Sequence, residues 1–102
     1  MTAYCEAAKI SDISEGSTMT VDIKGVHILL SKIGGEVHAL SGICTHEETD
    51  LGLGVVLEDK VVCPLHLSQF DLRTGEVLNP PALVPLKTFN VKIEDGTIYV
   101  EV

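Results

Sequence analysis

The chain has 102 residues, of which 45% are hydrophobic and 22% are charged, a composition that is ordinary for one globular domain. Fifteen acidic residues outnumber seven basic ones and give a net charge of −8, so nucleic acid and anionic membranes are poor partners and a basic protein surface is a better one. The longest uncharged apolar stretch, residues 25–31, is too short to cross a bilayer, and the N-terminus lacks the regions of a signal peptide, which predicts a cytoplasmic domain without membrane attachment.

Alternation of apolar and polar residues with a period of two dominates the chain and predicts an all-β domain. Residues 9–15 are expected to hold at most a single helical turn. Residues 18–23 and 26–30 flank a turn at Lys24-Gly25 and predict a hairpin. A further strand is expected over residues 36–40, directly before the first of two cysteine-containing loops.

The second half of the chain continues the same pattern. Short strands are expected at residues 55–57 and 61–62, on either side of a tight turn. Near the C-terminus, Asp95-Gly96 supplies the two positive φ angles of a type I′ turn between two alternating runs. We expect the odd-numbered residues of 89–93 and the even-numbered residues of 98–102 to share one face of that hairpin.

Two short motifs carry the chemistry: Cys44-Thr45-His46 and Cys63-Pro64-Leu65-His66. Each supplies one thiolate and one imidazole, and the 16 residues between them suffice for a strand pair that brings the loops face to face. Zinc fingers usually place a Cys pair before a His pair, whereas here the two ligand types alternate. A Rieske-type [2Fe–2S] centre needs two imidazoles on one iron and two thiolates on the other, which two such loops can supply together. A structural zinc module for protein binding is the alternative with the same four ligands.

The string CTHEETDLGLG…VVCPLHLSQFDLRTGEV…PPALVPL resembles the Rieske ferredoxins, and in particular the small carriers of ring-hydroxylating dioxygenase systems. The likeness is strong over residues 36–102. It implies a single domain over residues 1–102, an antiparallel β-sandwich or barrel with a cluster-binding subdomain of two loops at about residues 43–72. It also implies a monomeric, non-enzymatic one-electron carrier with one [2Fe–2S] cluster per chain, between a flavoprotein reductase and a terminal oxygenase. A redox-sensing or accessory subunit of another oxidoreductase would share the cluster but not the carrier role.

The resemblance also implies a role for each residue of the two motifs. Cys44 and Cys63 would bind the buried iron, while His46 and His66 would bind the outer iron through their Nδ1 atoms. Cys5 then has no cysteine partner, and we expect it to be a small packed side chain of the first strand.

Three more residues are expected around the cluster by the same comparison. Ser68 matches a serine that hydrogen-bonds a bridging sulfide in high-potential members, and Phe70 stands where those members have a tyrosine hydroxyl aimed at a ligand sulfur. Pro81 belongs to a stiff loop that covers one side of the cluster in the family. Thr49 and Leu65 replace the two extra cysteines of high-potential members. We therefore predict a reduction potential in the lower half of the Rieske range, raised somewhat by Ser68.

Two features near the motifs, a group of acidic residues and Leu67, allow two interpretations each. Three acidic residues closely follow the first motif: Glu47, Glu48 and Asp50. They either steer a basic partner or form an ordinary solvated loop. Leu67 stands where the family often has glycine, and it either contributes to a docking surface or shields the cluster. His27 and His38 lie inside predicted strands without a nearby second ligand and are expected to be structural or surface residues.

Overall fold

A computed structural model of the chain describes residues 3–45, 49–64, 67–79 and 84–102. These residues form short strands and two single-turn 3₁₀ helices, in the order β1 (Tyr4–Lys9), η1 (Ile10–Asp12), β2 (Thr18–Ile23), β3 (Val26–Ile33), β4 (Glu36–Ser41), η2 (Leu51–Leu53), β5 (Val55–Leu57), β6 (Lys60–Val62), β7 (Gln69–Asp71), β8 (Val77–Asn79), β9 (Thr88–Phe89), β10 (Val91–Glu94) and β11 (Thr97–Glu101). Within the described ranges no helix has the length and apolar character needed to span a membrane.

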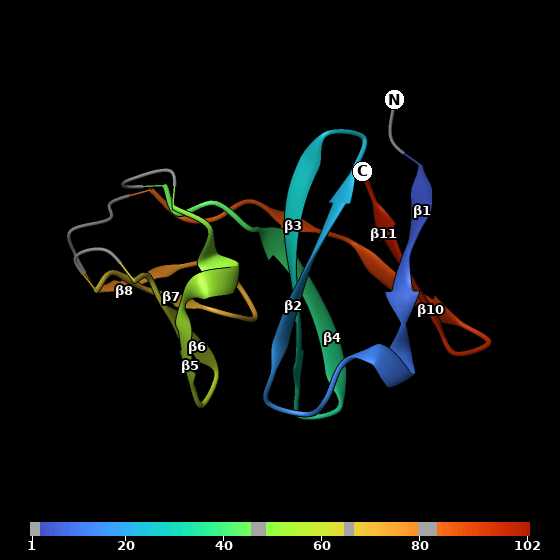
Figure 1. Ribbon diagram of the computed structural model, residues 1–102, viewed down its shortest axis with the longest axis horizontal. Helices are drawn as coiled ribbons and strands as arrows, with labels where there is room; N and C mark the ends of the chain where they lie inside the picture. Colours follow the sequence, from blue (N-terminus) through green and yellow to red (C-terminus); the bar gives the residue numbers. More distant parts are fainter. Residues whose placement is uncertain (1–2, 46–48, 65–66, 80–83) are drawn as a thin grey trace.

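The strands form three antiparallel sheets, with the orders β1-β11-β10, β2-β3-β4-β9 and β5-β6-β7-β8. Figure 1 shows the sheet of β2, β3 and β4 in the middle, with β1, β10 and β11 on one side and β5 to β8 on the other. The prediction of an all-β antiparallel fold is confirmed.

Strand β3 is buried on both faces because the middle sheet packs against both of its neighbours. Its residues 28–31 are all buried, and a strand with two covered faces favours a continuous apolar run over strict alternation. One face contributes to the sandwich core, whose buried members are Ile13, Ile28, Leu30, Val37, Ala39, Ile98 and Val100. The other face contributes to the thiol core, whose buried members are Leu29, Ile33, Leu40, Cys44, Leu51, Val61, Cys63, Phe70, Leu72 and Leu86.

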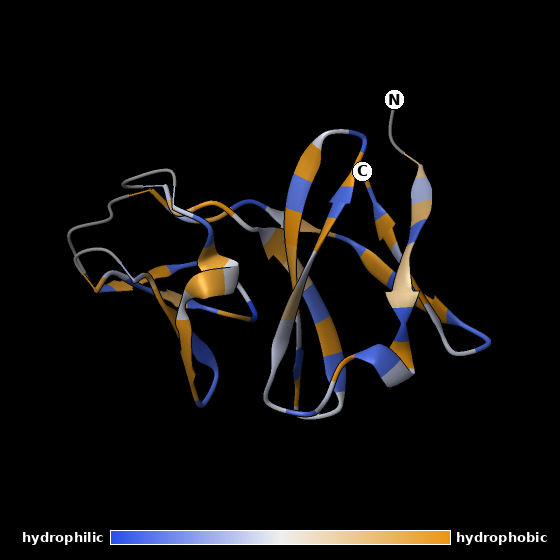
Figure 2. Ribbon diagram, viewed as in Figure 1, coloured by the Kyte–Doolittle hydropathy of each residue, from blue (hydrophilic) through white to orange (hydrophobic). Residues whose placement is uncertain are grey.

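Both predicted hairpins are present with the expected turns. Ile23 pairs with Val26, and Lys24 and Gly25 have φ angles of 52° and 77°. Asp95-Gly96 has φ angles of 50° and 75°, as a type I′ turn requires. Figure 2 shows apolar and polar bands alternating along the strands that these turns connect.

The predicted face of the C-terminal hairpin is only partly correct. Phe89 belongs to β9, which pairs with Ala39 of the middle sheet and does not continue into β10. Ile93 is 46% exposed, although its cross-strand partner Ile98 is fully buried. The reason is that β10 is an edge strand and Ile93 lies close to the hairpin turn, which projects from the molecule in Figure 1.

The predicted helical turn near the N-terminus is confirmed as η1. The backbone N–H of Lys9 donates to the Asp12 carboxylate at 3.0 Å, which closes the turn. The loop that follows contacts the turn between β3 and β4, since the Glu15 carboxylate accepts from the N–H groups of Gly34 (2.6 Å) and Gly35 (2.8 Å). These two backbone hydrogen bonds lower the pKa of Glu15 below its ordinary value.

Candidate metal centre

The two cysteine motifs begin on matching turns. The Cys44 N–H donates to the Thr49 carbonyl at 2.8 Å, and the Cys63 N–H donates to the Ser68 carbonyl at 2.7 Å, so each hydrogen bond closes a loop of six residues. Each closed loop includes in its sequence the histidine of the same motif, and His46 and His66 themselves lie outside the described residues. The two motifs thus have equivalent backbone frames at their cysteine ends.

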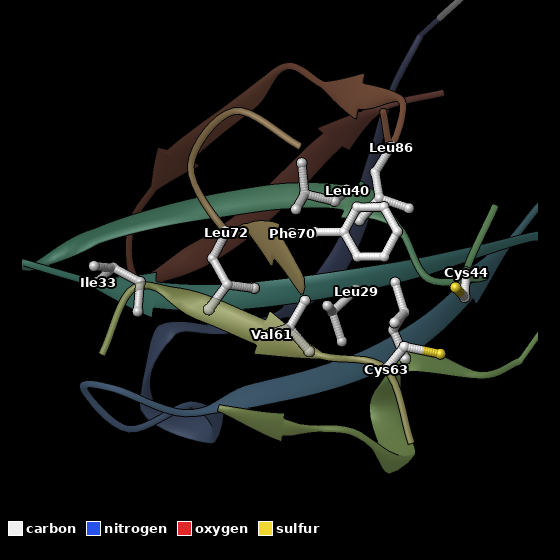
Figure 3. Close-up of a cluster of buried hydrophobic side chains, with 10 residues drawn as sticks. Leu29, Ile33, Leu40, Cys44, Val61, Cys63, Phe70, Leu72 and Leu86 are labelled. Atoms are coloured by element: carbon white, nitrogen blue, oxygen red, sulfur yellow. The ribbon is translucent and has the colours of Figure 1, made fainter. Parts of the chain in front are cut away.

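Both cysteine side chains are fully buried in the thiol core. Figure 3 shows Cys44 and Cys63 at the same end of this core, with the Phe70 ring further inside. Cys44 follows the middle sheet and Cys63 follows β6, so strands of two different sheets deliver the two thiols. Phe70 is fully buried in the same core.

The residues present fit an iron–sulfur cluster. Cys5, Cys44 and Cys63 all lie among the described residues, and of these three only Cys44 and Cys63 share a buried core. Two buried cysteine side chains that converge from separate loops match what the sulfur half of a Rieske ligand set requires. Among the described residues no group of three or more His, Cys, Asp or Glu side chains gathers, and the imidazole half of the predicted set is not among them. Cys5 is half-buried in β1.

The segment after the second motif has a strained residue at its surface. Leu67 has a φ of 61°, in the left-handed region that favours glycine, and its side chain is 63% exposed. Ser68, next to it, is fully buried. Leucine therefore adopts the conformation for which the family often has glycine, and its apolar side chain faces outward at the edge of the site.

A third segment joins the two cysteine loops. The Thr45 hydroxyl donates to the Val84 carbonyl at 2.6 Å, and the Asn79 side-chain amide donates to the Leu67 carbonyl at 3.4 Å. The two ends of the proline-containing loop are thus hydrogen-bonded one to each cysteine loop. Pro81 itself lies between these ends, in the part of the chain that is not described.

One residue near the site was not recognised from the sequence. His27 was expected to be structural or at the surface, and in the structure its Nδ1 lies 2.7 Å from Asp22 and its Nε2 lies 2.9 Å from Asp50. The hydrogen bond to Asp22, followed by that to Asp50, raises the pKa of His27. Asp50, one of the three acidic residues after the first motif, is therefore already paired, and the same hydrogen bond lowers its pKa. The other two, Glu47 and Glu48, are not described.

The antiparallel β fold and the two cysteines that share one buried core define the class of protein. Residues 3–90 match the Rieske [2Fe-2S] domain family, and the chain belongs to this family. It is a ferredoxin-type electron carrier with one Rieske [2Fe–2S] cluster per chain, and it is not itself a catalytic enzyme.

Three known proteins resemble the chain over nearly its whole length. The ferredoxin component of the naphthalene 1,2-dioxygenase system of Pseudomonas putida is 34% identical over 98 residues, which cover 96% of this chain and 94% of that protein. The ferredoxin of carbazole 1,9a-dioxygenase from Nocardioides aromaticivorans IC177 is 28% identical with a TM-score of 0.90, covering 96% of both chains. A chain in a complex of reduced oxygenase and oxidised ferredoxin of carbazole 1,9a-dioxygenase has 28% identity and a TM-score of 0.89, covering 95% of this chain and 91% of that one.

The comparisons decide between the alternatives that the sequence left open. A family defined by a [2Fe–2S] cluster excludes the structural zinc module as the explanation of the alternating motifs. The relatives are ferredoxin components, which favours the carrier over a redox-sensing or accessory subunit.

Proposed function

We propose that this ferredoxin carries single electrons from a flavoprotein reductase to a terminal ring-hydroxylating oxygenase, as a monomer in the cytoplasm. The relatives named for naphthalene and carbazole dioxygenase systems support the oxygenase partner. With Cys44 and Cys63 proposed as cluster ligands, Cys5 has no cysteine partner for a disulfide, which suits a reducing compartment. Anaerobic mixing with candidate reductases and oxygenases, followed by visible absorption, tests the proposal. Absence of electron transfer with every aromatic-ring system tried would contradict it, and gel filtration at the mass of a dimer would contradict the monomer.

The ligands that we propose are Cys44 and Cys63 for the buried iron and His46 and His66 for the outer iron. The observation that carries this assignment is the pair of fully buried cysteine side chains, in one core and on matched turns. When bound, a cluster with two thiolates and two neutral imidazoles accepts an electron more easily than one with four thiolates. The protein's part is to hold the two motifs in register within a subdomain of about residues 43–72.

Substitution of the thiols tests the assignment, and the chain offers a matched control. Cys44→Ser and Cys63→Ser are each expected to abolish the visible absorption of the cluster and to lower iron and acid-labile sulfide per chain to background. Cys5→Ser removes a free cysteine from β1, away from the thiol core, and should retain both. His46→Ala and His66→Ala are expected to resemble the thiol variants. A fully loaded Cys44→Ser or His66→Ala variant would overturn the ligand set.

We propose that Pro81 covers one side of the cluster. The hydrogen bonds from Thr45 to Val84 and from Asn79 to Leu67 support this, because they attach both ends of the loop to the two cysteine loops. Pro81→Gly should speed the bleaching of the oxidised protein by small water-soluble chelators. An unchanged bleaching rate would remove Pro81 from the site.

We further propose that partners dock at the edge of this site through an apolar contact. Leu67 in the second cysteine loop is 63% exposed, Val84 beside the first is 59% exposed, and the net charge of −8 favours a basic partner surface. Leu67→Asn removes the apolar group but keeps a residue that tolerates positive φ. It should slow electron transfer without lowering the unfolding midpoint. Equal transfer rates for Leu67→Asn and the wild type would leave only a shielding role.

A further inference from the structure

We propose that His27 is a positioning residue for the cluster, because it holds both stems of the first ligand loop to the middle sheet. The inference rests on the proposed ligands Cys44 and His46, which this loop carries. His27 itself lies in β3, outside both cysteine motifs and outside the expected subdomain.

The His27 imidazole is fixed from two directions. Asp22 is its cross-strand partner in the β2-β3 hairpin, and the Asp22 carboxylate lies 2.7 Å from Nδ1. The Asp50 carboxylate lies 2.9 Å from Nε2. When the ring is protonated it donates through both nitrogens, and both contacts are then charge-assisted hydrogen bonds. The side chain of His27 is only 23% exposed, compared with 73% for Asp22 and 39% for Asp50.

His27 reaches the two stems of the loop through different atoms. Its backbone carbonyl accepts from the Gly42 N–H at 2.9 Å, which fixes the stem that enters the loop. Its ring binds Asp50 on the stem that leaves the loop. The stems are joined to each other by the bridge between Ile43 and Asp50 and by the bond from the Leu51 N–H to the Gly42 carbonyl at 2.8 Å. One residue of the sheet therefore fixes the frame from which Cys44 extends.

The packing around the ring shows how closely it fits. A Cβ atom added at Gly42 would lie 2.7 Å from Cδ2 of His27, so the ring occupies the space above this glycine. Gly42 is not needed for a left-handed backbone, since its φ is not positive. The same Asp50 oxygen that binds His27 also accepts from the Gly52 N–H at 2.8 Å, at the start of η2. His27 thus sits in a fitted contact between the hairpin and the loop base.

Among the described residues, the charged groups that face the ring are Asp22 from β2 and Asp50 before η2, while Gly42 after β4 brings none. Both carboxylates favour the protonated ring, and loss of its second proton removes one of the two charge-assisted bonds. The support for the loop is therefore expected to be strongest at slightly acidic pH and weaker at alkaline pH.

His27→Gln tests the proposal in the cluster-loaded protein. The variant should still bind iron and sulfide fully, because all four proposed ligands remain. It is expected to lose the cluster to a chelator about tenfold faster than the wild type at pH 6, the effect of one hydrogen bond to a charged group. The ratio of the two rates should fall toward one as the pH is raised to 9. EPR of the reduced protein should show altered g values, since the imidazole-bearing loop has lost its fixed frame.

Two controls separate positioning from general instability. Val100→Ala shortens a buried side chain of the sandwich core and lowers overall stability without touching the loop. Glu94→Gln removes one surface carboxylate from an ion pair with Lys92 on β10. Both should leave the rate of cluster loss and the EPR spectrum close to those of the wild type. The proposal is overturned if His27→Gln keeps its cluster as long as the wild type, or if Val100→Ala loses it equally fast with the same pH profile. If instead the wild type binds no cluster at all, the proposed function fails first.

Discussion

Adjacent residues of β3 support different parts of the molecule, and truncating each of them should have different consequences. Leu29 and Leu30 are both fully buried, but Leu29 packs in the thiol core and Leu30 in the sandwich core. Figure 3 shows Leu29 close to Val61 and Phe70 in the core that ends at the two thiols. Leu→Ala at a fully buried site costs about 2.7–5 kcal/mol, so both variants should lose a similar part of the unfolding free energy.

The two variants should differ in how fast they lose the cluster. Even the lower value, about 2.7 kcal/mol, raises the population of a state in which the thiol core is open by roughly 100-fold. Leu29→Ala should therefore lose visible absorption in chelator about 100-fold faster than the wild type, whereas Leu30→Ala should stay within a few fold. Urea unfolding, followed by far-UV circular dichroism, verifies that the two losses of stability are comparable. Equal rates of cluster loss in variants of equal stability would refute the division into two cores.

Three further predictions concern the site and its surroundings. Ser68→Gly is expected to lower the midpoint potential by roughly 20–60 mV, which is the free energy of one hydrogen bond expressed for a one-electron couple. A redox titration in which the midpoint does not move would show that Ser68 does not tune the potential. The raised pKa of His27 stabilises the folded state, and this contribution is fully present below the pKa of about 6.5 that His27 has in the unfolded chain. The contribution is lost as the pH rises through the pKa of His27 in the folded protein, so the urea midpoint should fall across that pH window in the wild type but not in His27→Gln. Thr45→Val deletes the hydroxyl that donates to the Val84 carbonyl and should speed bleaching of the cluster by oxygen. Thr97→Val deletes the hydroxyl that accepts from Lys9 in the sandwich and should not change the bleaching rate. Similar bleaching in both threonine variants would argue against a role for the Thr45 contact.

The local features of the fold were predictable from the sequence because they depend on neighbouring residues. Lys24-Gly25 and Asp95-Gly96 fix their hairpins through positive φ angles, and the flanking apolar alternation fixes the register. The convergence of Cys44 and Cys63 followed from two motifs of matching composition. Each of these predictions needed only a short stretch of chain or a recognisable ligand pattern.

The contacts that were missed join residues far apart in sequence. The pairing of Phe89 with Ala39 depends on how the chain returns from the site to the middle sheet, and no periodicity specifies it. The position of Asp22 opposite His27 was available from the hairpin register, since both lie the same distance from the turn. The contact of His27 with Asp50 was not, because 23 residues and an entire strand separate them.

The arrangement of β3 explains why supports for the site are found on a strand that carries no predicted ligand. Side chains alternate between the faces of a strand, so His27, Leu29 and Ile33 share one face, while Ile28 and Leu30 share the other. The first face contacts the loop base through His27 and the thiol core through Leu29 and Ile33, and the second packs into the sandwich core. The strands β5 to β8 have only three residues each, so their ladders alone contribute little rigidity. The position of the thiols therefore depends on the register of β3, since a slip of one residue would exchange the two faces and remove every one of these contacts at once.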